Sequence, residues 1–193
     1  MMRVGTSERI CSAALPVFAD RGWTGASMAA IRRAADVSNG SLYHHFGSRA
    51  ELAARLLVDG MTDAQQAVVG VLAQAGSAEQ GVREVVRAQL VWVEESAGLA
   101  RLLYADLPDE VLLAAEPAFS EHNRRYVDLV GDWLRGHAQQ HTVIDAPFGV
   151  AHALWLGPAQ EFARHWLRGR SKLRPAAAAP ALADGAWRAL ASG

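Results

Sequence analysis

Apolar side chains recur along this chain at spacings of three and four residues, the period of an amphipathic α-helix, while strand-like alternation never persists. The first apolar stripe follows a possible cap at Thr6 or Ser7 and is closed by Gly22. Comparable stripes predict further helices, over residues 27–35, 38–46, 48–61, 82–93, 99–104, 119–137, 146–168 and 182–190. The pattern therefore predicts an all-α protein.

Two proline-containing segments refine this prediction. Pro117 is expected in the first turn of the helix that includes residues 119–137, where its missing N–H sacrifices no hydrogen bond. The run Pro-Ala-Ala-Ala-Ala-Pro over residues 175–180 is expected to be a linker, because its composition is so simple.

The composition is that of a globular protein, with 51% hydrophobic and 20% charged residues among 193. The single cysteine, Cys11, excludes an internal disulfide and is expected to be an inert, buried side chain. We find no secretory signal and no apolar run of about 18 residues. A soluble, cytoplasmic protein without membrane association is therefore expected.

The charge is distributed unevenly along the chain. Residues 1–50 carry six arginines and three acids, a balance of +3. The remaining residues carry 13 basic and 17 acidic side chains, a balance of -4. A basic N-terminal part on an acidic body is typical of a DNA-binding module attached to a sensor.

The most informative segment covers residues 27–46. It predicts two short helices joined by a tight turn at Asp36, a residue type that tolerates left-handed backbone geometry. The second helix presents small polar residues first and rings after them: Asn39, Gly40, Ser41, Tyr43, His44 and His45. Small residues at a helix N-terminus allow close approach to base edges in a major groove. The same shape also occurs as plain packing, in which Tyr43 and Phe46 would belong to the core.

These residue types suit contacts with duplex DNA. The side chains of Asn39 and Ser41 can donate to or accept from bases. Those expected to reach phosphates are Tyr43, His44, Ser27 and Arg49. Removal of Arg49 is accordingly expected to weaken binding to all sequences alike and to flatten its salt dependence.

A longer run carries a family resemblance: Val37-Ser-Asn-Gly-Ser-Leu-Tyr-His-His-Phe-Gly-Ser-Arg-Ala-Glu-Leu52. Together with Gly22, Thr24 and Ile31 upstream, it closely resembles the TetR (tetracycline-repressor-like) regulators. The resemblance implies a helix-turn-helix DNA-binding domain over residues 5–64 and a larger helical bundle over 65–193 for effector binding and dimerisation. It also implies a homodimeric transcriptional regulator that binds double-stranded DNA, a repressor released from a palindromic operator by a small-molecule effector.

Carried over position by position, the resemblance implies a DNA-contact set. Ser27 caps its helix at a phosphate, and Asn39, Gly40 and Ser41 face bases; Tyr43 and His44 lie along the backbone, and Arg49 neutralises a phosphate. The sequence departs from the family pattern at three positions. Asp36 replaces the usual turn glycine, Asn39 stands where lysine is common, and Arg49 replaces a lysine.

The segment after residue 65 shows no diagnostic motif. Residues suited to an apolar effector pocket with polar anchors are Trp92, Tyr104, His122, Tyr126, Trp133 and Trp155. A wide stripe, formed by His152, Trp155, Ala159, Phe162 and Trp166, is either a dimer interface or intramolecular core. The family resemblance implies that the last two helices pair with those of a partner.

Two other classes of protein are alternatives. Enzymatic activity is not predicted, because no phosphate loop, nucleophile elbow or His-Glu-x-x-His pair is present, and neither a cofactor nor a metal is predicted. His137 with His141, and Glu161 with His165, have the spacing of metal ligands, but such pairs are usually surface polar groups. The other alternative is a helical scaffold whose DNA-binding head has decayed. It would lack the steep salt dependence of true duplex binding.

Overall fold

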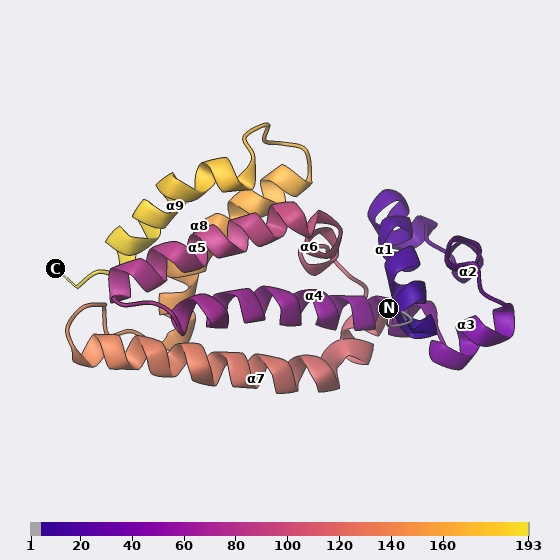
Figure 1. The fold of residues 1–193 in the computed structure, drawn as a ribbon, viewed down its shortest axis with the longest axis horizontal. Coiled ribbons are helices and arrows are strands. Elements are labelled where there is room, and N and C mark those ends of the chain that lie inside the picture. The colour runs from indigo at the N-terminus through magenta and orange to yellow at the C-terminus, as the bar shows by residue number, and fades with distance from the viewer. Residues whose placement is uncertain (1–4, 193) are drawn as a thin grey trace. The chain divides into compact units, whose positions relative to one another are not determined.

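The computed structural model describes residues 5–192. Over this range the chain is helical apart from its connections and an isolated antiparallel bridge between Val143 and Ala191 (Figure 1). The helices are α1 (Thr6–Gly25), α2 (Met28–Ala35), α3 (Asn39–His45), α4 (Arg49–Leu72), α5 (Ala78–Glu95), α6 (Ala97–Leu103), α7 (Asp109–Gln139), α8 (Phe148–Leu167) and α9 (Pro175–Leu190). The predicted all-α fold is confirmed.

The chain divides into two compact units. Among the described residues, the first comprises 5–61 together with 98–120, and the second comprises 62–97 and 121–192. Residues 98–120 fall in the domain that the sequence analysis assigns to effector binding, yet Leu102, Val111 and Ala115 belong to the core of the first unit. The functional boundary at residue 64 stays a prediction.

The first unit is built around the apolar stripes of its short helices. Its completely buried large side chains include Ile10 of α1, Ile31 of α2, Leu42 of α3 and Leu52 of α4. One large residue from each helix thus meets in a common core, and burial of each contributes roughly 1.5–3 kcal/mol. Cys11 lies in the same core, and burial raises the pKa of its thiol, as suits a packing residue.

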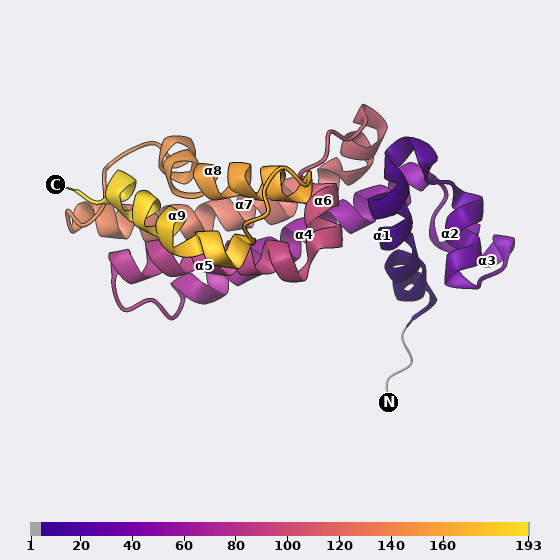
Figure 2. The same cartoon turned by 90° about the horizontal axis from the view of Figure 1, so that it is seen from above.

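The second unit contains α5, α8 and α9, of which α9 packs against both of the others (Figure 2). Trp155 of α8 is 1% exposed, and its ring stacks on Trp133 of α7 with centroids 5.5 Å apart. Its indole N–H donates to the carbonyl of Val82 in α5 at 2.9 Å, so the buried polar atom is satisfied. Trp155 and Ala159 are therefore intramolecular core, whereas Phe162 and Trp166 are half-buried.

Two expectations about proline are wrong. Residues 175–180 are the first turns of α9, because alanine is the best helix former and Pro175 occupies a first-turn position that needs no N–H. Pro117 lies inside α7, which already begins at Asp109. Acidic side chains in the first turn of α7, Asp109 and Glu110, favour that earlier start. None of the helices within residues 5–192 has the length and apolarity that a membrane crossing requires.

Candidate nucleic-acid interface

Serine side chains start both helices of the predicted helix-turn-helix. The Ser27 hydroxyl accepts a hydrogen bond from the Ala30 amide at 3.2 Å, and Ser38 accepts one from the Ser41 amide at 3.1 Å. Each bond satisfies an amide that a helix N-terminus leaves unpaired. Asp36 ends α2 in the left-handed conformation, at φ 50° and ψ 55°. The predicted cap at Ser27 and the predicted turn at Asp36 are confirmed.

Helix α3 turns nearly all its side chains outward. Leu42 is completely buried and, with Phe46 just beyond the helix, fixes α3 to the core. Tyr43 is 48% exposed, which excludes it from the core that the alternative interpretation required. The other exposed residues of the helix are Asn39, Gly40, His44 and His45, and Ser41 is half-buried. The structure thus gathers the predicted base-facing residues on one exposed helix.

Arg49, another predicted phosphate contact, has partners inside the protein. Its Nη1 donates to the carbonyl oxygens of Trp23 at 2.9 Å and Ala26 at 2.6 Å. Its guanidinium carbon lies 3.9 Å from the centre of the Trp23 ring, a cation–π arrangement. The sequence analysis did not single out Trp23, although an aromatic residue directly after Gly22 was a possible signal of a contact there.

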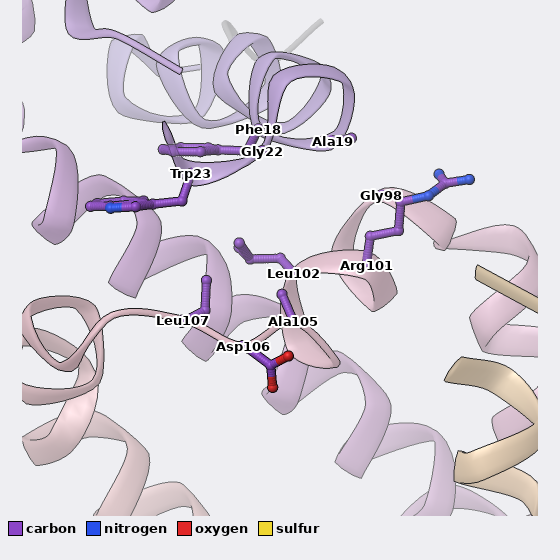
Figure 3. Close-up of a pocket in the computed structure, with 10 residues that line it drawn as sticks. All are labelled: Phe18, Ala19, Gly22, Trp23, Gly98, Arg101, Leu102, Ala105, Asp106 and Leu107. Atoms are coloured by element: carbon purple, nitrogen blue, oxygen red, sulfur yellow. The ribbon is translucent and has the colours of Figure 1, made fainter. Parts of the chain in front are cut away.

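Trp23 lies beside a cavity of the first unit. The cavity has a volume of about 210 Å³ and is lined by Phe18, Ala19, Gly22, Trp23, Gly98, Arg101, Leu102, Ala105, Asp106 and Leu107 (Figure 3). The rings of Phe18 and Trp23 are parallel, with centroids 6.0 Å apart. Figure 3 shows Arg101 extending away from these rings. The Trp23 side chain is therefore packed on only part of its surface.

The six predicted effector residues do not share one cavity. His122 and Tyr126 lie together beside a cavity of about 470 Å³ in the second unit, lined by Thr62, Gln65, Gln66, Val69, Gly70, His122, Arg125, Tyr126 and Leu129. Trp155 is buried in the core, and the half-buried Trp133 stacks on it. Trp92 is buried and donates to Asp63 at 2.7 Å, and Tyr104 belongs to the first unit.

His152 was not among the predicted effector residues, yet it contacts one of them. Its Nε2 lies 3.3 Å from the Tyr126 hydroxyl, and the two rings meet edge to face. Burial lowers the pKa of His152, because a charged imidazolium is poorly solvated there. Its sequence signal was its place in the stripe with Trp155, Ala159, Phe162 and Trp166, which indicated an interface or a packed helix face.

No group of three or more histidine, cysteine, aspartate or glutamate side chains within residues 5–192 is arranged to hold a metal ion. Glu161 instead pairs with His165 at 3.0 Å and with Arg164 at 2.6 Å. His137 Nδ1 lies 3.3 Å from the Thr142 hydroxyl. Glu161, His165 and His137 thus have local partners.

Residues 10–56 match the family model of the bacterial regulatory proteins, tetR family. This range contains both capped helices, the left-handed turn and Arg49. The N-terminal domain belongs to the TetR family. The resemblance that the sequence motif indicated is confirmed, and the TetR match includes every predicted DNA-contact residue.

Solved structures of TetR-family regulators share the fold along almost the whole chain. A regulator from Marinobacter aquaeolei VT8 superposes with a TM-score of 0.78 at 16% identity, over 97% of this chain and 96% of the other. A TetR-like regulator from Rhodococcus sp. RHA1 gives 0.71 at 23% identity, over 97% of each chain. FadR from Bacillus subtilis, solved with stearoyl-CoA, gives 0.78 at 16% identity, over 94% and 97%. No curated protein matches the chain.

Proposed function

We propose that this protein is a sequence-specific transcriptional repressor that binds a palindromic operator as a homodimer through α3. The proposal rests on the exposure of α3. Leu42 of this helix is buried in the core, while the small residues at its N-terminus face outward. A helix with this distribution can enter a major groove without clashing. The basic balance of residues 1–50 favours its approach to DNA.

Within this proposal the contacts divide by chemistry. Asn39 and Ser41 read base edges by hydrogen bonds, and Gly40 lets the helix come close to them. Tyr43 and His44 donate to phosphates, as does the N-terminus of α2 beside Ser27. A dimer must place its two α3 helices about 34–36 Å apart to reach successive major grooves.

The proposed dimer uses α8 and α9. Val150 is 51% exposed and Leu154 is 40% exposed, and they lie four residues apart on one face of α8. Leu154→Arg should place a charge in the interface and convert the dimer to a monomer that keeps its helical content. Light scattering coupled to gel filtration measures the mass. A Leu154→Arg dimer of wild-type stability would contradict this use of α8.

We further propose that the cavity between α4 and α7 of the second unit binds the effector. Arg125 and His122 line it together with Val69 and Leu129, and no acidic side chain does. This lining suits an organic anion with an apolar tail. FadR from Bacillus subtilis was solved with stearoyl-CoA, a molecule of that class, which supports an organic anion with an apolar tail as the first kind of probe.

The effector proposal can be tested with two ligands that differ in charge. Dodecanoate should raise the melting temperature and release DNA, while neutral dodecanol of the same chain length should act several-fold more weakly. Arg125→Gln should remove the difference between the ligands. Arg124→Gln, which loses the same charge on the same helix away from this lining, should keep it. Equal action of both ligands on wild-type protein would contradict an anionic effector.

The regulator proposal is tested by selection from a random duplex library at near-physiological salt, with Tyr43→Ala as the control. Wild-type protein should enrich a palindrome, and the variant should lose the enrichment. A transcription assay with and without the effector then separates repression from activation. If folded wild-type protein enriches no sequence and binds no duplex at low salt, the proposal is wrong and a scaffold function gains support.

A further inference from the structure

We propose that Arg49 is a positioning residue that fixes the helix-turn-helix, and that it does not serve as a phosphate contact. The inference rests on the proposed function, since it assigns a role within DNA recognition. It differs from the role that the sequence resemblance implies for this position. The reason is the set of internal partners that the guanidinium has.

The two carbonyls that Arg49 binds lie just before the helix-turn-helix, and Arg49 itself lies just after it. Ala26 directly precedes Ser27, the residue that caps α2. Arg49 is the first residue of α4, three residues after Phe46. The hydrogen bonds from Arg49 Nη1 to Trp23 and Ala26 therefore tie together the two ends of the helix-turn-helix, so that it forms a closed loop. Loop closure of this kind restricts how α2 and α3 move as a pair.

The turn that carries Trp23 is open on one side, although Ala26 just beyond it is buried in the core of the first unit. Gly22 has a left-handed φ of 64°, and a side chain there would meet nothing within 4 Å. Trp23 is half-buried and borders the cavity of about 210 Å³ (Figure 3). The Trp23 ring stacks on Phe18 and packs against the core, but part of its surface borders the cavity. The guanidinium adds a further constraint on this ring from the side of α4.

Arginine suits this combination of hydrogen bonds and ring contact better than lysine does. The guanidinium is flat, so it can donate hydrogen bonds in its own plane while its face lies on an aromatic ring. Lysine carries a compact charge that has no such face. Both hydrogens of Nη1 are used by the two carbonyls, so only Nε and Nη2 could still donate, and the contact with the Trp23 ring fixes the plane in which they lie. The departure from the family's lysine at this position is thus explained by the Trp23 contact.

The test uses the full-length protein and three variants: Arg49→Gln, Arg49→Lys and Arg9→Gln. Arg9 is an exposed arginine of α1 and controls for the loss of one charge in the same unit. Affinity for the selected operator is measured over a series of salt concentrations. Arg49→Gln should lower affinity about tenfold or more, the usual effect of losing charged hydrogen bonds, with the salt slope close to that of Arg9→Gln. Arg49→Lys should recover only part of the loss.

A second readout reports on position directly and needs no DNA. Protein labelled with 5-fluorotryptophan gives a fluorine resonance for Trp23, assigned by its absence in Trp23→Phe. Arg49→Gln should shift this resonance and accelerate amide exchange over residues 22–31, whereas Arg9→Gln should change neither. If Arg49→Gln does not fold, Trp23→Leu takes its place and should lower operator affinity comparably.

Three results would overturn the proposal: a salt slope reduced by about one in Arg49→Gln, full recovery of affinity in Arg49→Lys, or an unmoved Trp23 resonance. Wild-type affinity in Trp23→Leu would do so as well. Failure of the regulator proposal is recognised separately, because wild-type protein would then bind no duplex while the resonance and exchange measurements still report on Arg49.

Discussion

The helix-turn-helix and the second unit are both helical, but they are specified in different ways. In the helix-turn-helix, α2 and α3 span only eight and seven residues, and each begins with a serine that caps its first turn. In the second unit Ser77 caps α5, but α8 and α9, which span 20 and 16 residues, begin without a side-chain cap. Short helices are marginal in water, so caps matter most for them. Longer helices rely instead on the surfaces that they bury.

This difference predicts which property a mutation should change in each region. In the second unit, a change of volume in the core should alter stability and leave DNA binding by folded protein intact. In the helix-turn-helix, the same kind of change on the exposed face should alter DNA binding and leave stability nearly intact. Glycine-to-alanine substitutions test both halves of this statement, because one methyl group is added in each case.

Gly81→Ala should give the largest loss of stability. A Cβ at this position of α5 would lie 2.5 Å from Cζ2 of Trp133, whose ring is held by its stack on Trp155. The overlap forces the ring or the helix to move, at a cost of about 1–3 kcal/mol. Urea denaturation measures it. Gly185→Ala in α9 is the control: its Cβ would meet nothing within 4 Å, so stability should rise by up to about 1 kcal/mol. Equal behaviour of the two variants would refute the packing argument.

Gly40→Ala should separate binding from stability. The added Cβ would lie 4.0 Å from the nearest atom, the Ser38 hydroxyl, so the folded protein has room for it. Stability should stay level or rise slightly because alanine favours helices. Operator affinity should fall about tenfold, the scale of one lost base contact, since the methyl group blocks close approach. Affinity equal to that of Gly185→Ala would show that α3 docks elsewhere.

Removing a serine cap should cost about 0.5–2 kcal/mol in either region. Ser38→Ala removes the bond to the Ser41 amide, and Ser77→Ala removes the equivalent bond to the Gln80 amide at the start of α5. Denaturation should register both losses. Operator affinity should fall in Ser38→Ala alone, because that cap orders the recognition helix. An equal drop in Ser77→Ala would mean that the two regions are not separable in this way.

The smallest effect concerns pH. Burial lowers the pKa of His152 below its ordinary value of 6.5. As the pH falls below 6.5, the unfolded chain takes up this proton first, so its free energy falls relative to the folded state. The contribution of His152 to stability is therefore present above pH 6.5 and is lost as the pH falls towards its folded pKa. His152→Gln should flatten the decline in melting temperature between pH 7 and pH 5, about the range in which histidine titrates. The same flattening in His44→Gln, an exposed histidine, would contradict this assignment.

The sequence was most informative where local chemistry decides structure. Serine caps, the turn at Asp36 and the outward-facing residues of α3 depend on neighbours within a few positions, and all three were predictable. The proline-rich stretch of α9 was not, because simple composition suggested a linker. Pro175, Ala178 and Ala179 are buried, and only their packing partners reveal why this segment is a helix.

The sequence alone was enough to predict the all-α fold, the position of the helix-turn-helix and the resemblance of residues 10–56 to the TetR family. It could do so because periodicity and capping act over short distances along the chain. Tertiary structure alone decided that Arg49 binds Trp23 and Ala26, since 26 and 23 positions separate those partners from it. It also decided that Trp155 is core and that His122 and Tyr126 share a cavity with α4. Contacts between residues so far apart in the sequence produce no periodic pattern along the chain, because they depend on how whole helices pack.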